Sequence, residues 1–321
     1  MCTGVRFSDG EGNMYFARNL DWCCSYGERV VITPTGYRPT SPFGATTEIR
    51  WPVIGMGIVE QNVPLYFDCA NQAGLAVAGL NFPGYASYES DAVAGKTNVA
   101  SWELPLWIVS RFSTVDEVEA ALADVAVVDK PVSDRFPTSL LHWIVGDATR
   151  SIAIEYTADG MHVFDDDVDV LTNQPGFAWH RENLRNYLNV TSDVAPKTTW
   201  DRASLEPYGS GGAMRGMPGD YYSPSRFVRI AYLNANYPVQ QGEKANVSRM
   251  FHELGGVSMI DGAARMTNGQ FETTVYTGGF SSRTNTYYYT TYDEPAIRSV
   301  ALADHDTSGS ELIEVADPLR S

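Results

Sequence analysis

The sequence of 321 residues predicts a layered α+β fold, in which antiparallel sheets carry helices on their outer faces. Short apolar or alternating runs typical of strands occur in blocks, and stretches with helical spacing separate these blocks. A regular alternation of single strands and helices, which is typical of a parallel sheet, does not occur. No internal repeat or linker marks a boundary, so residues 1–321 are predicted to form one domain.

The first block of predicted strands fills the N-terminal part of the chain. Gly, Asp, Asn and Pro residues separate its members, as expected of turns. These strands are Gly4–Phe7, Met14–Leu20, Arg29–Thr33, Val53–Val59, Leu65–Cys69 and Leu75–Leu80.

A helical region is predicted next, from about Ser101 to Ala126. Thr114 and Glu117 have the spacing of a capping box, and apolar residues follow at helical spacing. The later predicted strands are Leu140–Val145, Ser151–Tyr156, Val168–Leu171, Thr274–Thr277 and Thr286–Tyr292. The later predicted helices are at about Trp179–Leu188, Ser225–Asn236 and Ala245–Leu254.

The segment Asn189–Asp220 is rich in Gly, Pro, Ser and Thr and has little periodicity. It is longer than the loops that usually connect elements within a compact domain. We therefore expect an excursion from the domain at about 189–220, with a role in assembly or substrate binding.

The charge balance excludes some classes of protein. The chain has 23 Lys and Arg against 39 Asp and Glu, a net charge of −16, which argues against a nucleic-acid partner. It has no apolar run of about 18 residues and no pattern of a signal peptide, so we expect a cytoplasmic protein without a membrane partner. The cysteines, Cys2, Cys23, Cys24 and Cys69, lack C-x-x-C spacing, which argues against a disulfide framework or zinc site.

Most standard catalytic motifs are missing. A G-x-S-x-G serine motif fails because Arg283 stands where the second glycine is needed. The histidines have no metal-ligand spacing, and the run from Asp165 to Asp169 departs from a calcium loop at Val170, where a glycine is required. We expect neither a catalytic metal nor a cofactor.

The N-terminus carries the clearest chemical signal. A small second residue normally permits removal of the initiator Met, which would leave Cys2 with a free α-amino group. A thiolate attacks amide carbonyls well, and an α-amine with a pKa of about 8 is a suitable base at neutral pH. Arg18 and Asp21 end a predicted strand that would pair with the N-terminal strand. Arg18 would stabilise the thiolate, and Asp21 would hold the amine.

Five motifs, with the residues around Cys2 first among them, occur in order along the chain. They are M-C-T-G-V-R-F from Met1, A-R-N-L-D-W from Ala17, N-F-P-G-Y from Asn81, L-T-N-Q-P from Leu171 and S-P-S-R-F from Ser223. In these motifs the sequence resembles the choloylglycine hydrolase family, which includes bile salt hydrolases and penicillin V acylases. The resemblance extends through D-E-P-A-I-R near the C-terminus and covers essentially the whole chain.

The resemblance implies a four-layer αββα sandwich of two antiparallel sheets, the N-terminal nucleophile (Ntn) hydrolase fold. It also implies a set of catalytic residues, namely Cys2, Arg18, Asp21, Asn81, Asn173 and Arg226. Asn173, with a donor from Asn81, would form the oxyanion hole, whereas each asparagine alone would be interpreted as a turn residue. Arg226 would hold the thiolate and Asp21 in place.

The implied substrate is a bile salt conjugated with glycine or taurine, and the implied assembly is a homotetramer. Aromatic and apolar residues would line the steroid pocket, namely Trp22, Tyr26, Met56, Phe67, Phe136 and Leu141. Penicillin V or an N-acyl homoserine lactone is an alternative substrate for the same chemistry. Acyl transfer to other amines and a non-catalytic bile-acid-binding protein are further alternatives.

Overall fold

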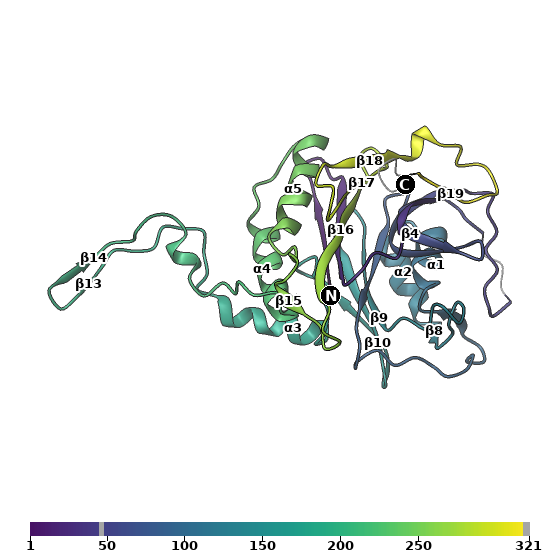
Figure 1. Cartoon of the computed structure of the whole chain (residues 1–321), viewed down its shortest axis with the longest axis horizontal. Helices are drawn as coiled ribbons and strands as arrows, with labels where there is room; N and C mark the ends of the chain where they lie inside the picture. Colours follow the sequence, from purple (N-terminus) through teal and green to yellow (C-terminus); the bar gives the residue numbers. More distant parts are fainter. Residues whose placement is uncertain (45–47, 317–321) are drawn as a thin grey trace.

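The computed structural model describes residues 1–44 and 48–316 of the chain (Figure 1). Within them, two large antiparallel sheets contain most of the strands. The first has the order β12 (Val170–Leu171), β1 (Cys2–Ser8), β2 (Met14–Trp22), β16 (Phe271–Ser281), β17 (Thr286–Thr291) and β18 (Arg298–Ala301), with β15 (Ala264–Arg265) also paired to β16. The second has the order β11 (Gly160–Asp165), β10 (Ser151–Thr157), β9 (Leu141–Gly146), β6 (Ala76–Asn81), β5 (Val63–Asn71), β4 (Val53–Glu60), β3 (Arg29–Thr33) and β19 (Ile313–Glu314).

Helices cover the outer face of each sheet. Helices α4 (Ser223–Asn236) and α5 (Glu243–Gly255) pack on the first sheet, where α3 (Phe177–Asn183) also contacts α4. Helices α1 (Leu104–Arg111) and α2 (Val115–Leu122) share a hydrophobic core with the second sheet. Figure 1 shows the resulting order of helices, sheet, sheet and helices, which confirms the predicted α+β fold and the αββα sandwich.

Strand β2 lacks the alternation of apolar and polar residues that a strand with one exposed face has. Eight of its nine residues are buried in succession, because the second sheet covers one face and α5 packs against the other. A strand covered on both faces does not alternate between apolar and polar residues. Polar side chains on β2 are therefore buried, and each needs a partner within the protein.

The predicted helical region from Ser101 to Ala126 is two helices and a strand. The Thr114 capping box is confirmed, since the backbone nitrogen of Glu117 donates to Thr114 Oγ1 at 3.2 Å and Glu117 Oε2 accepts from the Thr114 backbone. The chain then turns, and β8 (Val125–Val128) pairs in parallel with β7 (Thr97–Ala100). The valines of β8 favour a strand, and this preference ends the helix earlier than predicted.

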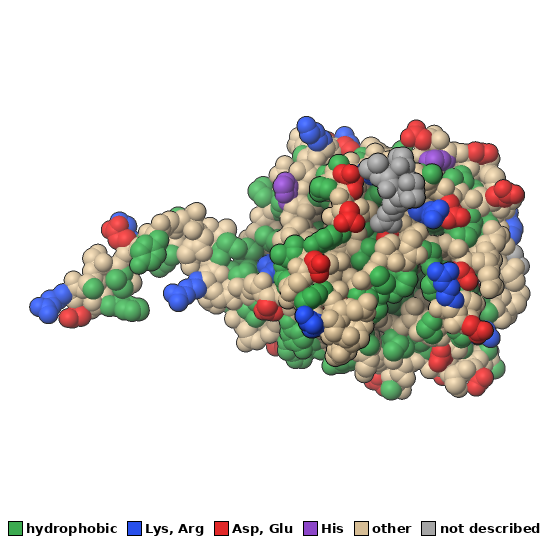
Figure 2. All heavy atoms as spheres, viewed as in Figure 1, with side chains coloured by type: hydrophobic (Ala, Val, Ile, Leu, Met, Phe, Trp, Pro, Cys, Tyr) green, Lys and Arg blue, Asp and Glu red, His purple; other side chains and the backbone are tan. Residues whose placement is uncertain are grey.

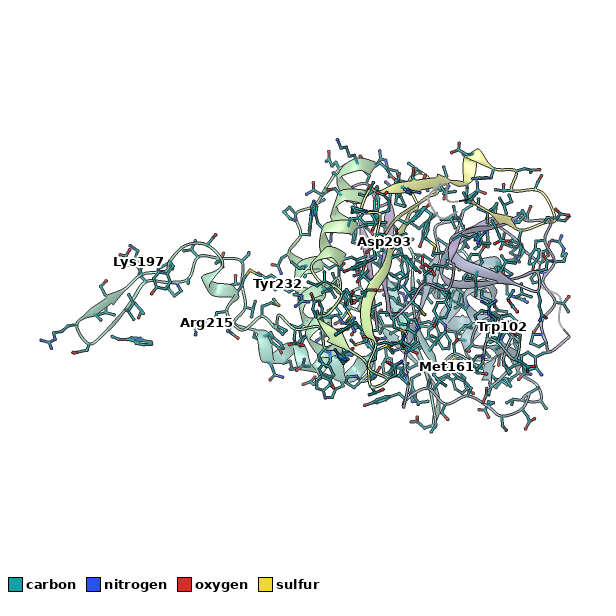
Figure 3. All side chains as sticks on the ribbon, viewed as in Figure 1. Trp102, Met161, Lys197, Arg215, Tyr232 and Asp293 are labelled. Carbon is teal, nitrogen blue, oxygen red and sulfur yellow. The ribbon has the colours of Figure 1, made fainter. Side chains whose placement is uncertain are left out.

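The segment from residue 189 to residue 220, here called the arm, extends away from the sandwich in Figures 1 and 2. It contains the hairpin of β13 (Thr198–Trp200) and β14 (Ala203–Leu205), whose residues are all exposed. Figure 3 shows Lys197 far out on the arm and Arg215 closer to the sandwich. The role of this segment and the single-domain organisation stay predictions.

Short 3₁₀ helices complete the described elements, namely η1 (Leu184–Tyr187), η2 (Gly212–Met214) and η3 (Leu302–Asp304). Of the helices in the described residues, none has the length and apolar character needed to cross a membrane. The expected cytoplasmic location stays a prediction.

Candidate active site at the N-terminal strand

Cys2 opens β1 and is almost completely buried. In the ladder between β1 and β2, Cys2 lies opposite Leu20 and Gly4 lies opposite Arg18. Residues two apart on a strand share a face, so Arg18 lies diagonally across from Cys2 on the face toward the second sheet. Gly4 has no side chain between them, and a Cβ there would lie 3.0 Å from Ile144 Cγ2 of that sheet.

Asn173 and Arg226 hold the backbone of Cys2. The Cys2 nitrogen donates to Asn173 Oδ1 at 2.7 Å, and Arg226 Nη1 donates to the Cys2 carbonyl oxygen at 2.5 Å. Arg226 Nη2 donates to the same Asn173 oxygen at 2.8 Å. One guanidinium from α4 and one amide from the loop after β12 thus hold the first residues of β1 at fixed positions.

Asp21 is buried on the same strand as Arg18. Its backbone pairs with Met1, and its Oδ1 accepts from Thr274 Oγ1 at 2.6 Å. A register shift between Thr274 and Tyr276 in β16 places Thr274 opposite Asp21. Burial raises the pKa of Asp21, while the positive charges of Arg226 and the N-terminus act in the opposite direction.

The guanidinium of Arg226, which is predicted to hold the thiolate and Asp21 in place, does not donate a hydrogen bond to Asp21. Its hydrogen bonds go to the backbone of Cys2, to Thr3 Oγ1 at 2.6 Å, to Asn173 and to the Tyr221 carbonyl oxygen. The second oxygen of Asp21 has no hydrogen-bond partner. Arg226 therefore influences Asp21 through its charge and acts on Cys2 through the backbone.

Asn81 reaches the site from the second sheet. It ends β6 opposite Leu141, and its carbonyl oxygen accepts from Asn173 Nδ2 at 2.7 Å. The two asparagines predicted to act together are therefore in contact across the sandwich, although 92 residues separate them in the chain. One proton of the Asn173 amide is used in this bond, and the second donates to no acceptor among the described residues.

A cavity of about 610 Å³ opens beside these residues. Cys2, Arg18, Asp21 and Asn81 lie in its wall, and most of the remaining wall is apolar. Five of the six predicted wall residues line it, namely Trp22, Tyr26, Phe67, Phe136 and Leu141. Met56 was predicted wrongly, because it belongs to β4 and is buried in the hydrophobic core outside the cavity wall.

The family model for linear amide C-N hydrolases of the choloylglycine hydrolase family matches residues 2–315. The chain belongs to the choloylglycine hydrolase family. This hydrolase is 59% identical over 317 residues to a bile salt hydrolase/transferase of Bifidobacterium longum subsp. longum, covering 98% of this chain and 100% of that protein. It is 44% identical to a conjugated bile acid hydrolase of Lactobacillus acidophilus, with 98% and 99% of the two chains covered.

Solved structures agree with this assignment. The conjugated bile acid hydrolase from Clostridium perfringens superposes with a TM-score of 0.93 and 32% identity, over 99% of this chain and 97% of that one. Penicillin V acylase from Agrobacterium tumefaciens has a TM-score of 0.77 and 18% identity, over 97% and 90% of the chains. The second likeness concerns the fold alone.

In this hydrolase chain, Met1 still precedes Cys2. The Met1 ammonium donates to the Asp21 carbonyl oxygen at 2.5 Å and to Glu272 Oε1 at 2.8 Å. The nitrogen of Cys2 is therefore a peptide nitrogen here, and it can donate a hydrogen bond but cannot act as a base. Sequence reasoning missed Glu272, which is buried on β16 and has no motif around it.

A second layer of residues supports Asn173. Ser223 Oγ accepts from the Asn173 backbone nitrogen at 3.0 Å and lies 3.0 Å from Thr172 Oγ1. His180 Nε2 lies 2.9 Å from the Asn173 carbonyl oxygen, and its ring stacks on Phe227. Sequence reasoning missed these residues, although Thr172 and Ser223 lie within the L-T-N-Q-P and S-P-S-R-F motifs.

Replacing His180 by Gln is expected to reduce the loss of stability in acid. Burial lowers the pKa of His180 from 6.5 to about 4. Between these values only the unfolded chain binds the proton, so the free energy of unfolding falls as the pH drops from 6.5 towards 4. From pH 7 to pH 4.5 this contribution is about 2 to 3 kcal/mol, and His180→Gln removes it.

Urea unfolding at the two pH values measures this difference. The matched control is His162→Gln, because His162 is only half-buried and pairs with Asp159. Equal acid losses in wild type and His180→Gln would contradict the prediction.

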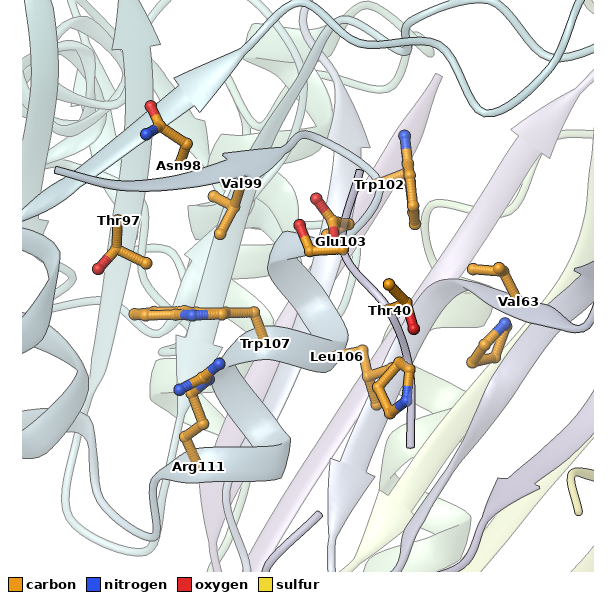
Figure 4. Close-up of a pocket in the computed structure, with 13 residues that line it drawn as sticks. Thr40, Val63, Thr97, Asn98, Val99, Trp102, Glu103, Leu106, Trp107 and Arg111 are labelled. Atoms are coloured by element: carbon orange, nitrogen blue, oxygen red, sulfur yellow. The ribbon is translucent and has the colours of Figure 1, made fainter. Parts of the chain in front are cut away.

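Another, smaller cavity of about 50 Å³ lies beside α1. Figure 4 shows Glu103, which immediately precedes α1, and Trp107 and Arg111 of α1 next to Thr97 and Val99 of β7 in its wall. Its volume is too small for a steroid or another drug-sized ligand. Among the side chains that the structure describes, no group of three or more His, Cys, Asp or Glu residues is arranged to hold a metal ion.

Proposed function

We propose that this enzyme cleaves the amide bond of glycine- or taurine-conjugated bile salts through a thioester on Cys2. The observation that carries the proposal is a cysteine at the start of β1 whose backbone is held by Asn173 and Arg226 beside a mostly apolar cavity of about 610 Å³. Cavities of this size and character bind ligands of steroid dimensions. The relatives named as bile salt and conjugated bile acid hydrolases support the same substrate class.

The first half of the reaction would acylate Cys2. After removal of Met1, the Cys2 α-amine takes the thiol proton, and Sγ forms a bond to the amide carbon. Negative charge develops on the carbonyl oxygen, where the free proton of the Asn173 amide and a donor from Asn81 would stabilise it. The C–N bond then breaks, and the α-ammonium returns its proton to the nitrogen of the departing glycine or taurine.

The second half would regenerate the thiol. A water molecule gives a proton to the α-amine, and its oxygen bonds to the thioester carbon. The C–S bond breaks, the bile acid leaves, and the proton passes back to Sγ. Arg18 would stabilise the thiolate in both halves, because its buried guanidinium lines the same cavity as Cys2.

Release of the amino acid tests this proposal. Mature enzyme is incubated with glycocholate, taurocholate, penicillin V and an N-acyl homoserine lactone, and free glycine, taurine, the penicillin nucleus and homoserine lactone are quantified. Release of glycine or taurine that disappears in Cys2→Ala is the expected result. Preferential cleavage of penicillin V or of an N-acyl homoserine lactone would assign the same chemistry to another substrate, and turnover by Cys2→Ala would refute the mechanism.

Acyl transfer is a second candidate activity. The Bifidobacterium longum relative is named a bile salt hydrolase/transferase, and a thioester is open to attack by an amine as well as by water. Adding a second amino acid to the glycocholate reaction and searching for the new conjugate by mass spectrometry tests this activity. The absence of a new conjugate would leave hydrolysis as the sole reaction.

We also propose that the arm mediates assembly into a homotetramer. It exposes large apolar side chains, namely Leu188 at its base and Val194, Trp200, Leu205 and Tyr208 along it. A two-stranded hairpin is marginally stable alone in water, so β13 and β14 need a covering surface. The arm of one copy is suited to pack on another copy.

Replacing Trp200 by Ser is expected to convert the tetramer into smaller species. Trp200 is 73% exposed in the single chain, and large aromatic residues dominate interface energetics. Sedimentation velocity measures the change, with Ile297→Ser on the sandwich as the control for loss of an exposed apolar side chain. An unchanged sedimentation coefficient for Trp200→Ser would contradict the role of the arm.

A further inference from the structure

A buried carboxylate with two tyrosine partners lies across the interface of the two sheets, next to Arg18. Asp68 belongs to β5 in the second sheet, whereas Tyr276 on β16 and Tyr287 on β17 belong to the first. Tyr276 donates to Asp68 Oδ1 at 2.5 Å, and Tyr287 donates to Asp68 Oδ2 at 2.6 Å. All three side chains are buried, so the carboxylate is isolated from solvent. None of these residues belongs to the motifs from which the active site was predicted.

A β-bulge brings the strand of Asp68 to Arg18. Between β4 and β5, Met56 lies opposite Asp68 and Gly57 lies opposite Tyr66, which leaves Phe67 without a partner in that ladder. The carbonyl oxygen of Phe67 accepts from Arg18 Nη1 at 3.0 Å. Bulges often redirect groups next to active sites, and this one supplies an acceptor to the guanidinium.

Gly278 makes room for the tyrosine on the other side. It lies opposite Arg18 in the ladder between β16 and β2. A Cβ at Gly278 would lie 2.2 Å from the hydroxyl oxygen of Tyr287, so any larger residue would displace this hydroxyl. The backbone around Arg18 thus accommodates the hydroxyl that binds Asp68.

The carboxylate of Asp68 provides a negative charge near Arg18 without forming a hydrogen-bonded ion pair with it. Arg18 is 1% exposed, and such a buried cation requires a negative charge nearby. The guanidinium carbon lies 5.8 Å from the centre of the Tyr276 ring, and the two oxygens of Asp68 accept from tyrosine hydroxyls and not from Arg18. Arg18 Nη2 has no hydrogen-bond partner, although Arg18 lines the cavity with Cys2.

Electrostatics agree with this geometry. Burial raises the pKa of Asp68, whereas the positive charge of Arg18 and the two tyrosine hydroxyls favour its ionised form. Because both hydroxyls donate to it, the carboxyl group has the hydrogen-bond pattern of a carboxylate anion.

We propose that Asp68, held by Tyr276 and Tyr287, is a positioning residue for Arg18, supplying its counter-charge while leaving Nη2 free to act on the Cys2 thiolate. This inference rests on the proposed role of Arg18 in the reaction. The tyrosines are essential to it, because their two hydroxyls fix the orientation of the carboxylate, and a carboxylate released by one of them would turn towards Arg18 and withdraw the guanidinium from Cys2. Removing a tyrosine hydroxyl and removing the carboxylate charge therefore have opposite effects on the thiolate.

The test uses Tyr287→Phe and Asp68→Asn, with Tyr288→Phe as the matched control. Tyr288 is the next residue on β17, and its hydroxyl donates to another carboxylate, Glu243, at 2.9 Å. Mature enzyme is alkylated with iodoacetamide across a pH series, and modification of the N-terminal peptide is quantified by mass spectrometry, because exposed Cys24 also reacts. The other charged or titratable groups near Cys2 are the same in every variant, namely its α-amine, Tyr26, Asp21, Arg226 and Glu272.

Tyr287→Phe is expected to raise the pH of half-maximal Cys2 alkylation, and Asp68→Asn to lower it. Tyr287→Phe should also lower kcat for glycocholate about tenfold while KM changes less than about twofold. Tyr288→Phe should change neither quantity. If Tyr287→Phe does not fold, Tyr276→Phe removes the hydroxyl from the other oxygen and carries the same expectations.

Two results would overturn the proposal: alkylation profiles like wild type in both variants, or shifts of both in the same direction. Opposite shifts in an enzyme that releases no glycine from glycocholate would refute the proposed substrate and still support the positioning role, because alkylation does not depend on turnover.

Discussion

An enzyme that keeps a residue in front of Cys2 is expected to lose about 10²- to 10⁴-fold in kcat/KM for glycocholate, the contribution of a well-placed general base. In the chain with Met1, the Cys2 nitrogen is an amide that donates to Asn173 Oδ1 at 2.7 Å. Its lone pair is delocalised into the peptide bond and cannot accept the thiol proton. Cleavage before Cys2 turns this donor into an amine at the same position.

The experiment replaces Met1 by a short N-terminal extension that ends in a protease site directly before Cys2. The uncleaved and cleaved forms of one preparation are then compared, so the rest of the sequence is identical. Cys24→Ala is the control for loss of another thiol, because Cys24 is exposed and lies outside the cavity wall. Full activity of the uncleaved form would refute a mechanism in which the α-amine is the base.

The sandwich could be predicted from sequence because its strands are short and apolar and because Gly, Asp, Asn and Pro residues separate them. Arg29–Thr33 was predicted with the bounds that β3 has, and Ser223–Asn236 extends only two residues before the predicted start of that helix. Local sequence preference does not predict a short strand whose pairing partner lies elsewhere in the chain. The short strands β7 and β8 depend on each other for pairing, and each has only four residues, too few for a pattern that distinguishes a strand from a helix.

The site residues could be predicted only as a set, through the resemblance. Cys2 and Asn173 are separated by 171 residues, and Arg226 by 224 from the Cys2 oxygen it binds. No periodicity predicts such contacts, because they follow from how two sheets and α4 stack. Each asparagine alone resembles an ordinary turn residue.

The residues around Arg18 could not be predicted from the sequence for a different reason. Asp68, Tyr276 and Tyr287 lie within strands, where tyrosine is common and an isolated aspartate has no motif. Their relation to Arg18 depends on a bulge at Phe67 and a glycine at Gly278, and sequence patterns do not give such register details. Burial of charge is visible only in the structure.

Replacing Asn173 by Asp is expected to lower kcat by about 10²- to 10³-fold with a smaller change in KM, the magnitude typical of removing an oxyanion donor. The aspartate keeps an oxygen that accepts from the Cys2 nitrogen and from Arg226, so the backbone of Cys2 stays in place. It replaces the amide donor by a second acceptor, which faces the Asn81 carbonyl oxygen and the charge that develops on the substrate. The loss therefore appears in the transition state rather than in binding.

Asn71, a buried asparagine outside the site, provides the control that distinguishes an effect on catalysis from an effect on folding. Asn71 donates to the carbonyl oxygens of Val109 and Phe112 and accepts from Leu75, so Asn71→Asp disrupts an equally complete set of hydrogen bonds. Both variants should lose free energy of unfolding, measured in urea, but only Asn173→Asp should lose kcat on glycocholate. A similar kcat in the two variants would mean that Asn173 serves the fold alone, and the oxyanion would then have to be stabilised by Asn81 and Arg18.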